Sequence, residues 1–231
     1  LNLNGDTLTN TNGELLAAAD GLIVLAGVNL VGGELNSSGS GKFLVNASTA
    51  NYLRGITLNG VLDMSTVDSS RQRVTNGMTL NGTININSNG ILAFEGNNLL
   101  NGSGEIIFGG AGANRLDLDD NGTTTIGSDV TIRGESGTIG QQAFVGGTQV
   151  LVNNGLISAD VSGGTVALVE SGVTNTGVLE ARNGGTLSLQ VGVNNAGGEI
   201  LADGGTIALN GTSLSGGELN SGGSGTFRAF S

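Results

Sequence analysis

The sequence contains no cysteine, histidine, proline or tryptophan among its 231 residues, and its only aromatic residues are one Tyr and six Phe. Without cysteine there are no disulfides, no thiol catalysis and no Cys-based metal sites. Without histidine, Ser-His-Asp catalysis and His-ligated metal chemistry are excluded as well. A site built from carboxylates alone stays open, and Asp119/Asp120 is the adjacent acidic pair. We therefore expect a protein that is not an enzyme.

Basic residues are also scarce. Eight Lys and Arg oppose 19 Asp and Glu, which gives a formal net charge of −11. A charge of this sign repels nucleic acid and anionic lipid, so we expect no nucleic-acid partner. No apolar run approaches the roughly 18 residues that would suggest a membrane span, so we expect no membrane insertion.

Glycine and short alternating segments are what the chain has in abundance. It holds 44 Gly and 37% apolar residues, too many apolar residues for a disordered chain. The stretches 150–168, 173–191 and 191–209 each read as a turn with Asn and Gly, a short strand, a second Gly turn and a second strand. Their apolar residues alternate with a period of two, as a strand with one buried face requires.

The first strand of each such stretch recurs at a nearly constant interval. Successive units are 19 to 27 residues apart when they are aligned on a pair of inward residues. Such a step, with Gly at the corners, predicts a right-handed parallel β-solenoid of about ten coils that forms a single domain over residues 1–231. The aligned pairs are Leu15/Ala17, Leu35/Ser37, Leu62/Met64, Ile84/Ile86, Ile106/Phe108, Val130/Ile132, Ile157/Ala159, Leu179/Ala181, Ile200/Ala202 and Leu219/Ser221.

One segment of the sequence occurs twice in almost the same form. GGELNSSGSGKF (Gly32 to Phe43) returns 184 positions later as GGELNSGGSGTF (Gly216 to Phe227), and residues 12–27 resemble residues 197–211. The alignment places eight steps between each pair, which predicts one super-repeat of about 184 residues plus the start of the next. Similar coils could also arise by convergence, but the matching flanks favour duplication. Because the coil pattern runs to both ends without a cap, end-to-end self-association or pairing with further copies is expected.

The interior is predicted to widen near the middle, because the second inward position carries Met64, Ile86, Phe108 and Ile132 there and Ala or Ser elsewhere. At the corners, Asn153, Asn175 and Asn194 or Asn195 occupy equivalent turns. Their amides are predicted to form a structural ladder from coil to coil.

Runs such as VNNGLISADVSGGTVAL, TNTGVLEARNGGTLSLQ and NGSGEIIFGG resemble the Asn/Gly/Thr repeats of large bacterial exoproteins. They are similar to the β-solenoids of filamentous-haemagglutinin-like proteins and of autotransporter passengers, over nearly the whole chain. The resemblance implies an extracellular or cell-surface fibre whose solenoid acts as a stalk or scaffold, often in adhesion or matrix building.

A motif around Asp117 has a sharper interpretation. Asp117, Asp119, Asn121 and Gly122 fit the opening of a calcium loop, in which alternate oxygens converge on a hard cation. The twelfth position is Ser128, where such a loop usually places Glu. The alternative is that Leu116 and Leu118 point inward, Asp117 and Asp119 point outward, and Asn121-Gly122 makes a turn. Calcium is therefore the one cofactor that the sequence leaves possible.

The basic residues that the chain does have are clustered. The stretch from Gly41 to Gly77 gathers Lys42, Tyr52, Arg54, Arg71 and Arg73, which include half of all the basic side chains. A protruding loop with these side chains could bind an acidic surface glycan or a host or matrix component through Tyr52, Arg54, Arg71 and Arg73. The alternative is a solvated insertion that prevents edge pairing. The second long excursion, residues 133–149, has no comparable cluster.

A column of Thr165, Thr186, Thr206 and Thr226 raises the possibility of an ice-binding face, but it is single and Thr is common on strands. The function predicted from the sequence is a structural or adhesive extracellular fibre or stalk segment. The alternatives are a self-assembling extracellular filament or matrix subunit and a carbohydrate-binding or polysaccharide-degrading β-helix.

Overall fold

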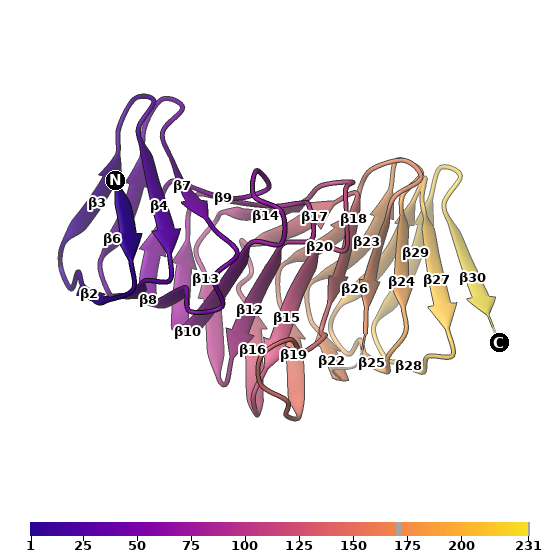
Figure 1. The fold of residues 1–231 in the computed structure, drawn as a ribbon. Helices are drawn as coiled ribbons and strands as arrows, with labels where there is room; N and C mark the ends of the chain where they lie inside the picture. The colour runs from indigo at the N-terminus through magenta and orange to yellow at the C-terminus, as the bar shows by residue number, and fades with distance from the viewer. Residues whose placement is uncertain (170–171, 231) are drawn as a thin grey trace.

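The computed structural model describes residues 1–169 and 172–230 and contains thirty β-strands and no helix among them. The strands wind into a parallel β-solenoid of about ten turns, which Figure 1 shows as a rod with the two termini at opposite ends. The solenoid prediction is confirmed, and its right-handed sense stays a prediction. At about 4.8 Å per coil the rod is roughly 50 Å long.

Each complete turn contributes a strand to each of three sheets, which we call the first, second and third sheet. The first sheet has eleven parallel strands, each paired with the equivalent strand of the next turn. They are β1 (Asn2–Asn4), β4 (Leu22–Ala26), β7 (Lys42–Val45), β9 (Val61–Met64), β11 (Thr83–Ile86), β14 (Glu105–Phe108), β17 (Thr131–Gly134), β20 (Leu156–Ala159), β23 (Val178–Arg182), β26 (Glu199–Asp203) and β29 (Glu218–Gly222).

The second and third sheets are joined where β8 (Tyr52–Leu58) and β10 (Arg71–Leu80) run across the corner between them. The second sheet comprises the first parts of β8 and β10 and nine further strands: β2 (Thr7–Thr9), β5 (Asn29–Val31), β12 (Ile91–Glu95), β15 (Arg115–Asp119), β18 (Ser136–Ile139), β21 (Thr165–Leu168), β24 (Thr186–Leu189), β27 (Thr206–Asn210) and β30 (Thr226–Phe230).

The third sheet comprises the remaining strands. It contains the second parts of β8 and β10 together with β3 (Glu14–Ala17), β6 (Glu34–Ser37), β13 (Asn98–Asn101), β16 (Gly122–Ile126), β19 (Gln149–Asn153), β22 (Gly172–Asn175), β25 (Val193–Asn194) and β28 (Leu214–Ser215).

One continuous apolar core runs along the axis of the rod. Alternate residues of all three sheets point into it, and most of them are fully buried. The corners are tight, and Gly is required where two coils approach closely: a Cβ at Gly33 would collide with the Asn10 carbonyl oxygen of the preceding coil, and Gly33 has a φ of +84°. That backbone region is readily open only to glycine.

The predicted register is correct for most coils and wrong at two places. Leu35 does not stack on Leu62: Leu35 lies in the third sheet under Leu58, whereas Leu62 lies in the first sheet over Phe43. The predicted alignment leaves out β8, whose seven residues supply two sides of the turn with the single glycine Gly55 at the corner between them. The predicted spacing of eight whole coils between the similar segments is therefore wrong.

The second error concerns the pair Val130/Ile132. Ile132 pairs with Ile106 and Gly134 with Phe108, so the inward pair is Ile132/Gly134. Val130 is buried at the corner before β17 rather than on the strand. Met64, Ile86 and Phe108, on which the predicted widening of the middle coils depends, stack in register and are buried, and the widening itself stays a prediction. It does not extend to Ile132, because Gly134 takes the position above Phe108.

The corner ladder of asparagines is confirmed, with Asn195 as its third member. The Asn153 amide donates to the Asn175 side-chain oxygen at 2.7 Å, and the Asn175 amide donates to that of Asn195 at 2.7 Å. All three residues are fully buried. The predicted Thr column also stacks in register, from Thr165 to Thr226 along the second sheet.

Candidate functional site: an arginine-tyrosine cluster on the second sheet

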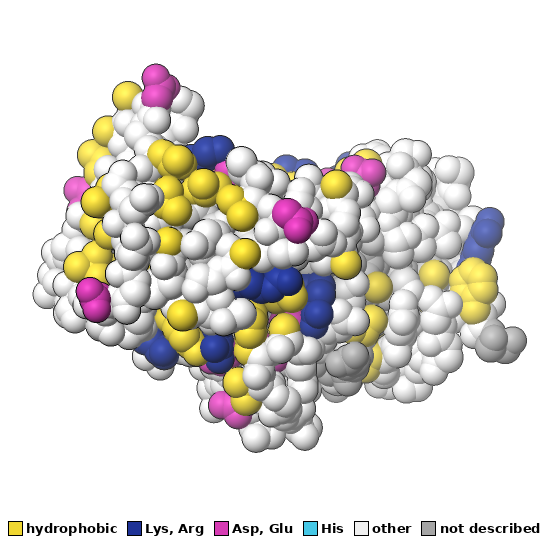
Figure 2. Space-filling view, in the orientation of Figure 1, with side chains coloured by type: hydrophobic (Ala, Val, Ile, Leu, Met, Phe, Trp, Pro, Cys, Tyr) yellow, Lys and Arg dark blue, Asp and Glu magenta, His cyan; other side chains and the backbone are white. Residues whose placement is uncertain are grey.

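The predicted ligand-binding residues lie on strands and not on a protruding loop, which corrects the prediction. Tyr52 and Arg54 belong to β8, and Arg71 and Arg73 to β10. Both segments alternate, with buried Leu53 between the first two. In the parts of these segments that carry the four residues, every second residue is charged or polar, and this composition suggests a loop although the segments alternate as strands do. Figure 2 shows basic side chains gathered over the middle of the rod.

Lys42, which the sequence groups with these residues, does not join them. It lies on β7 in the first sheet, and its Nζ contacts Asp63 Oδ2 at 2.6 Å. Burial raises the pKa of Asp63, but hydrogen bonds from Lys42, Thr66 and Ser65 outweigh it and hold the pKa well below its ordinary value. Lys42 and Asp63 are therefore a structural pair.

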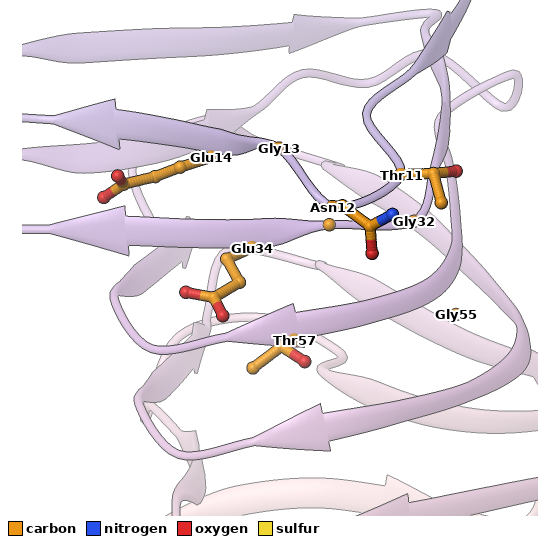
Figure 3. Close-up of a pocket in the computed structure, with 9 residues that line it drawn as sticks. Thr11, Asn12, Gly13, Glu14, Gly32, Glu34, Gly55 and Thr57 are labelled. Carbon is orange, nitrogen blue, oxygen red and sulfur yellow. The ribbon is translucent and has the colours of Figure 1, made fainter.

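Two grooves of the surface lie elsewhere, at glycine-lined corners. A groove of about 660 Å³ is lined by Gly13, Gly33, Glu14 and Glu34 among others (Figure 3). A similar groove of about 540 Å³ near the other end is lined by Gly198, Glu199, Gly217 and Glu218, among others. Their acidic rims do not suit an anionic ligand, so the cluster on the second sheet stays the candidate site.

At the centre of the cluster, two guanidinium groups pack against one aromatic ring. The Cζ atoms of Arg54 and Arg73 lie 4.3 Å and 4.4 Å from the centre of the Tyr52 ring. The parallel register explains this, because Tyr52 pairs with Arg73 on the neighbouring strand and Arg54 follows two residues later on the same face. Cation-π contacts at these distances hold both arginines against the sheet.

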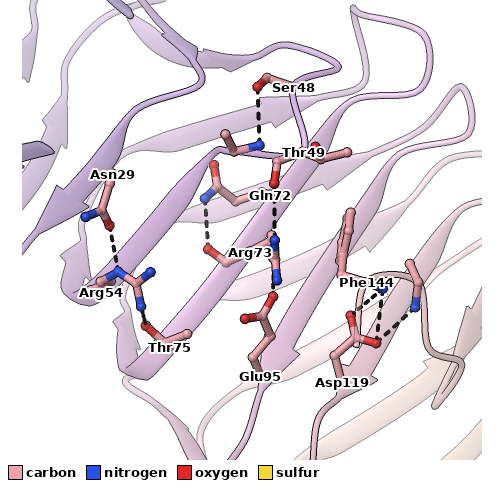
Figure 4. Close-up of polar contacts among 12 residues, drawn as sticks. Asn29, Ser48, Thr49, Arg54, Gln72, Arg73, Thr75, Glu95, Asp119 and Phe144 are labelled. Carbon is pink, nitrogen blue, oxygen red and sulfur yellow. Dashed lines mark hydrogen bonds and ion pairs between the residues drawn. The ribbon is translucent and has the colours of Figure 1, made fainter. Parts of the chain in front are cut away.

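The arginines differ in how their charge is compensated. Arg73 is ion-paired with Glu95 on β12 (Figure 4). Arg54 instead donates to the Asn29 side-chain oxygen at 2.6 Å and to Thr75 Oγ1 at 2.8 Å. Arg71 donates to the carbonyl oxygens of Ser70 at 2.9 Å and Asn89 at 2.8 Å.

Within residues 1–169 and 172–230, no carboxylate forms an ion pair with Arg54 or Arg71. Burial, followed by the neighbouring charge of Arg115, lowers the pKa of Arg71. At neutral pH an arginine nevertheless keeps its charge. The hydrogen-bond partners of both guanidinium groups are neutral, and the nearby carboxylates Asp117 and Asp68 partly oppose the lowering of the Arg71 pKa.

The loop between β18 and β19, which belongs to the second long excursion of the sequence, closes one side of the cluster. Phe144 on this loop lies 4.8 Å from the Arg73 guanidinium carbon. Asp119 on β15 anchors the loop, since it accepts backbone hydrogen bonds from Ala143 at 2.9 Å and from Phe144 at 3.2 Å (Figure 4). Phe144 and Glu95 are thus members of the site that the sequence analysis missed.

Burial is the main influence on the pKa values of Tyr52, at the centre of the cluster, and of Asp119, at its edge. It raises the pKa of Tyr52, with a further increase from Glu95, so the phenol is neutral at physiological pH. Burial likewise raises the pKa of Asp119, although the hydrogen bonds from Phe144 and Ala143 partly oppose it. The site therefore presents cations and a neutral phenol beside an anchored loop.

The predicted calcium ligands are each engaged by protein donors. Asp117 accepts from Arg115 Nε at 2.9 Å and Nη2 at 2.6 Å, Asp119 holds the loop, and the Asn121 side-chain oxygen accepts from the Thr148 N–H at 2.9 Å. Among the described residues, no group of three His, Cys, Asp or Glu is arranged to hold a metal ion. Calcium binding stays a prediction, and a cation at this position would have to displace these donors.

Comparison with family models, with curated proteins and with solved structures finds no match to this chain. In the described part of the chain, no helix is long and apolar enough to cross a membrane.

Proposed function

We propose that this chain is a structural, non-catalytic segment of an extracellular or cell-surface fibre or stalk, part of a large repetitive surface or secreted protein. The observation that carries the proposal is the unbroken stacking of the first sheet from β1 to β29 over one continuous core. A rod of this kind gains length by about 4.8 Å with each coil and keeps its cross-section.

Ion pairs on the surface also hold successive coils of the rod together. Arg133 on β17 contacts Glu105 of β14 at 2.8 Å and Asp160, just after β20, at 3.3 Å, so one arginine joins three successive coils. Glu105 raises the pKa of Arg133 by its hydrogen bond. Such charges reinforce the stack and keep its faces solvated, as an extracellular stalk requires.

The proposal predicts the shape of the isolated protein. Small-angle scattering at several concentrations should show an elongated particle roughly 50 Å long. Electron microscopy of the same samples distinguishes the alternative: long filaments at high concentration would favour a self-assembling filament or matrix subunit. A globular particle would overturn both.

A second role, binding of an acidic glycan, is favoured by Arg54, which is stacked on Tyr52, and by Arg71, which precedes Arg73 on the same strand; among the described residues neither forms an ion pair. Guanidinium groups pair with sulfate and carboxylate in a bidentate manner, and a stacked arginine loses little entropy on binding. Because the whole chain is acidic, binding has to be local and sensitive to salt.

The test uses dextran sulfate and the double variant Arg54→Ser with Arg71→Ser. Its matched control is Arg182→Ser with Arg228→Ser, which removes the same charge from exposed positions outside the cluster. We expect at least a tenfold loss of affinity in the first variant and little change in the second. Equal losses in both would show that binding follows net charge alone.

A further inference from the structure

The two ends of the rod contain the same seven-strand module. Strands β1 to β7 (residues 2–45) correspond to β24 to β30 (residues 186–230), and the four pairings within each set coincide. Leu15 pairs with Leu35 as Ile200 pairs with Leu219, and Ile23 pairs with Phe43 as Ile207 pairs with Phe227. In the third pairing, Leu3 stacks on Leu25 in the first module and Leu189 stacks on Leu209 in the second. In the fourth, Leu8 stacks on Leu30 and Val193 stacks on Leu214.

The polar contacts of the turns coincide as well. The Asn10 amide donates to the Gly13 carbonyl at 3.1 Å, and Asn195 donates to Gly198 at 3.1 Å. On the surface, one amide bridges two stacked carboxylates in each module, and in the first module these carboxylates flank the groove of Figure 3. Asn36 donates to Glu14 at 2.6 Å and to Glu34 at 3.4 Å, and Asn220 donates to Glu199 at 2.7 Å and to Glu218 at 3.2 Å.

The modules nevertheless lie on different sheets. Strand β6 belongs to the third sheet, whereas its counterpart β29 belongs to the first. Eight successive pairings lead along the third sheet from β6 to β28, and β29 is the next strand on the next face. The repeat therefore spans eight and one third turns.

We infer that the rod is an array of units of eight and one third turns, and that the end formed by β28, β29 and β30 is built to receive the next unit, beginning with a segment like residues 44–64. The inference rests on the proposed role of the chain as one segment of a longer rod. The proposed partner is a further copy of this unit, rotated about the rod axis so that each of its strands lies on the next sheet.

The first module shows what such a unit covers. Strand β8 places Leu53 over Leu30 and Leu58 over Leu35, and β9 places Leu62 over Phe43. Leu35 and Phe43 are fully buried as a result, whereas the counterpart of Leu35, Leu219, is 53% exposed. The counterparts of Leu30, Leu35 and Phe43 are Leu214, Leu219 and Phe227, so the same three leucines fit them without changing register.

The one-face rotation has a consequence for the arginine-tyrosine cluster. The next unit would carry its copy of Tyr52, Arg54, Arg71 and Arg73 on the third sheet, and the unit after that on the first. Three units make 25 turns and return the cluster to the second sheet. An array of these units thus presents the cluster on all three faces.

Two spliced chains test the inference. In the module-matched splice, residues 1–227 continue directly with residues 44–227, so Leu44 takes the place of Arg228. In the face-matched control, residues 1–227 continue with residues 91–227. Ile91 lies in the same column as Arg228, so each strand of the control keeps its own sheet while the module is broken.

We expect the matched splice to remain monomeric, to lengthen by about 40 Å in small-angle scattering, and to slow amide hydrogen exchange in the first copy's β28 to β30 at least tenfold. The control splice should leave those amides as fast as in the parent chain. The control adds six turns, roughly 29 Å at about 4.8 Å per turn. Equal protection of β28 to β30 in the control together with that full extension, or a matched splice that leaves β28 to β30 unprotected, would overturn the inference. The rod shape of the parent chain, on which the proposed function depends, is measured separately.

Discussion

In the middle coils the second inward column of the first sheet carries Met64, Ile86 and Phe108, whereas from β20 to β26 it carries Ala159, Ala181 and Ala202. A column of the third sheet changes in parallel: Met78, Leu100 and Ile126 in the middle give way to Asn153, Asn175 and Asn195. One backbone plan thus accommodates a section filled by large apolar side chains, which we call the wide section, and a section with small side chains and a buried amide ladder.

The boundary between the two sections has an energetic cost. Ile126 lies directly above Asn153, and the Asn153 side-chain oxygen has no hydrogen-bond partner there. A buried amide is tolerated when both neighbouring coils complete its hydrogen bonds, which holds only inside the ladder. In both columns, therefore, a side chain is matched to the side chains of the coils before and after it more than to its own strand.

The largest effect is expected from breaking the wide section. Phe108→Ala removes a fully buried ring over Gly134 and Gly137, which have no side chains to fill the space. We expect the free energy of unfolding to fall by about 3–5 kcal/mol, measured by urea denaturation. The control is Phe230→Ala, since that ring is 50% exposed and should cost less than 1 kcal/mol. A comparable small loss for Phe108→Ala would contradict a rigid wide section.

Breaking the ladder comes next. Asn175→Ala removes the donor to Asn195 and the acceptor for Asn153, and leaves buried polar groups unpaired. We expect a loss of about 2–3 kcal/mol in the same measurement, because each unsatisfied buried group costs about 1–3 kcal/mol. Asn194→Ala is the matched control, since Asn194 is the exposed neighbour of the ladder. If both variants lose the same amount, the ladder contributes nothing specific.

The sequence predicts the regular part of this comparison and not the exceptions. Gly-marked corners and period-two alternation place Ile84, Ile106, Ile157, Leu179 and Ile200 in one column. The prediction fails at β8, where the chain turns without a Gly-rich corner, and at Val130, where a corner residue is as apolar as a strand residue. A local pattern cannot separate these cases, because only the neighbouring coil shows which side a residue faces.

The candidate site is predicted to a similar extent. Tyr52, Arg54, Arg71 and Arg73 stand out by composition, and the structure places all four on the adjacent strands β8 and β10, where Arg54 and Arg73 contact Tyr52. Phe144 carries no such signal, since its place depends on the hydrogen bonds between Asp119 and a loop 24 residues later. Contacts made by an irregular loop do not follow from periodicity, so this part of the site needed the structure.

A smaller effect is expected for a substitution that loosens the loop beside the candidate site and leaves the apolar core intact. Asp119→Ala removes the carboxylate that holds Ala143 and Phe144, without touching the apolar interior. We expect the loop to open locally and chymotrypsin to cleave after Phe144 about 5–30 times faster, which corresponds to a local loss of about 1–2 kcal/mol. Asp120→Asn, which removes the neighbouring exposed charge and still tolerates the φ of +64° at this position, should leave cleavage nearly unchanged. An equal increase in both would show that Asp119 does not anchor the loop.

The smallest effect concerns acid and Asp63, which lies beside Met64 on β9. The pKa of Asp63 is depressed in the folded chain, so its ionised form contributes stability above its ordinary pKa, near 4, and that contribution is lost as the pH falls below this value. We expect the stability difference between the natural chain and Asp63→Asn to be constant from pH 6 to 8 and to shrink progressively below about pH 4. Lys42→Gln keeps the hydrogen bonds from Ser65 and Thr66, so part of the acid step should remain in that variant. A difference that does not change with pH would mean that the Asp63 carboxylate gains nothing from its partners in the fold.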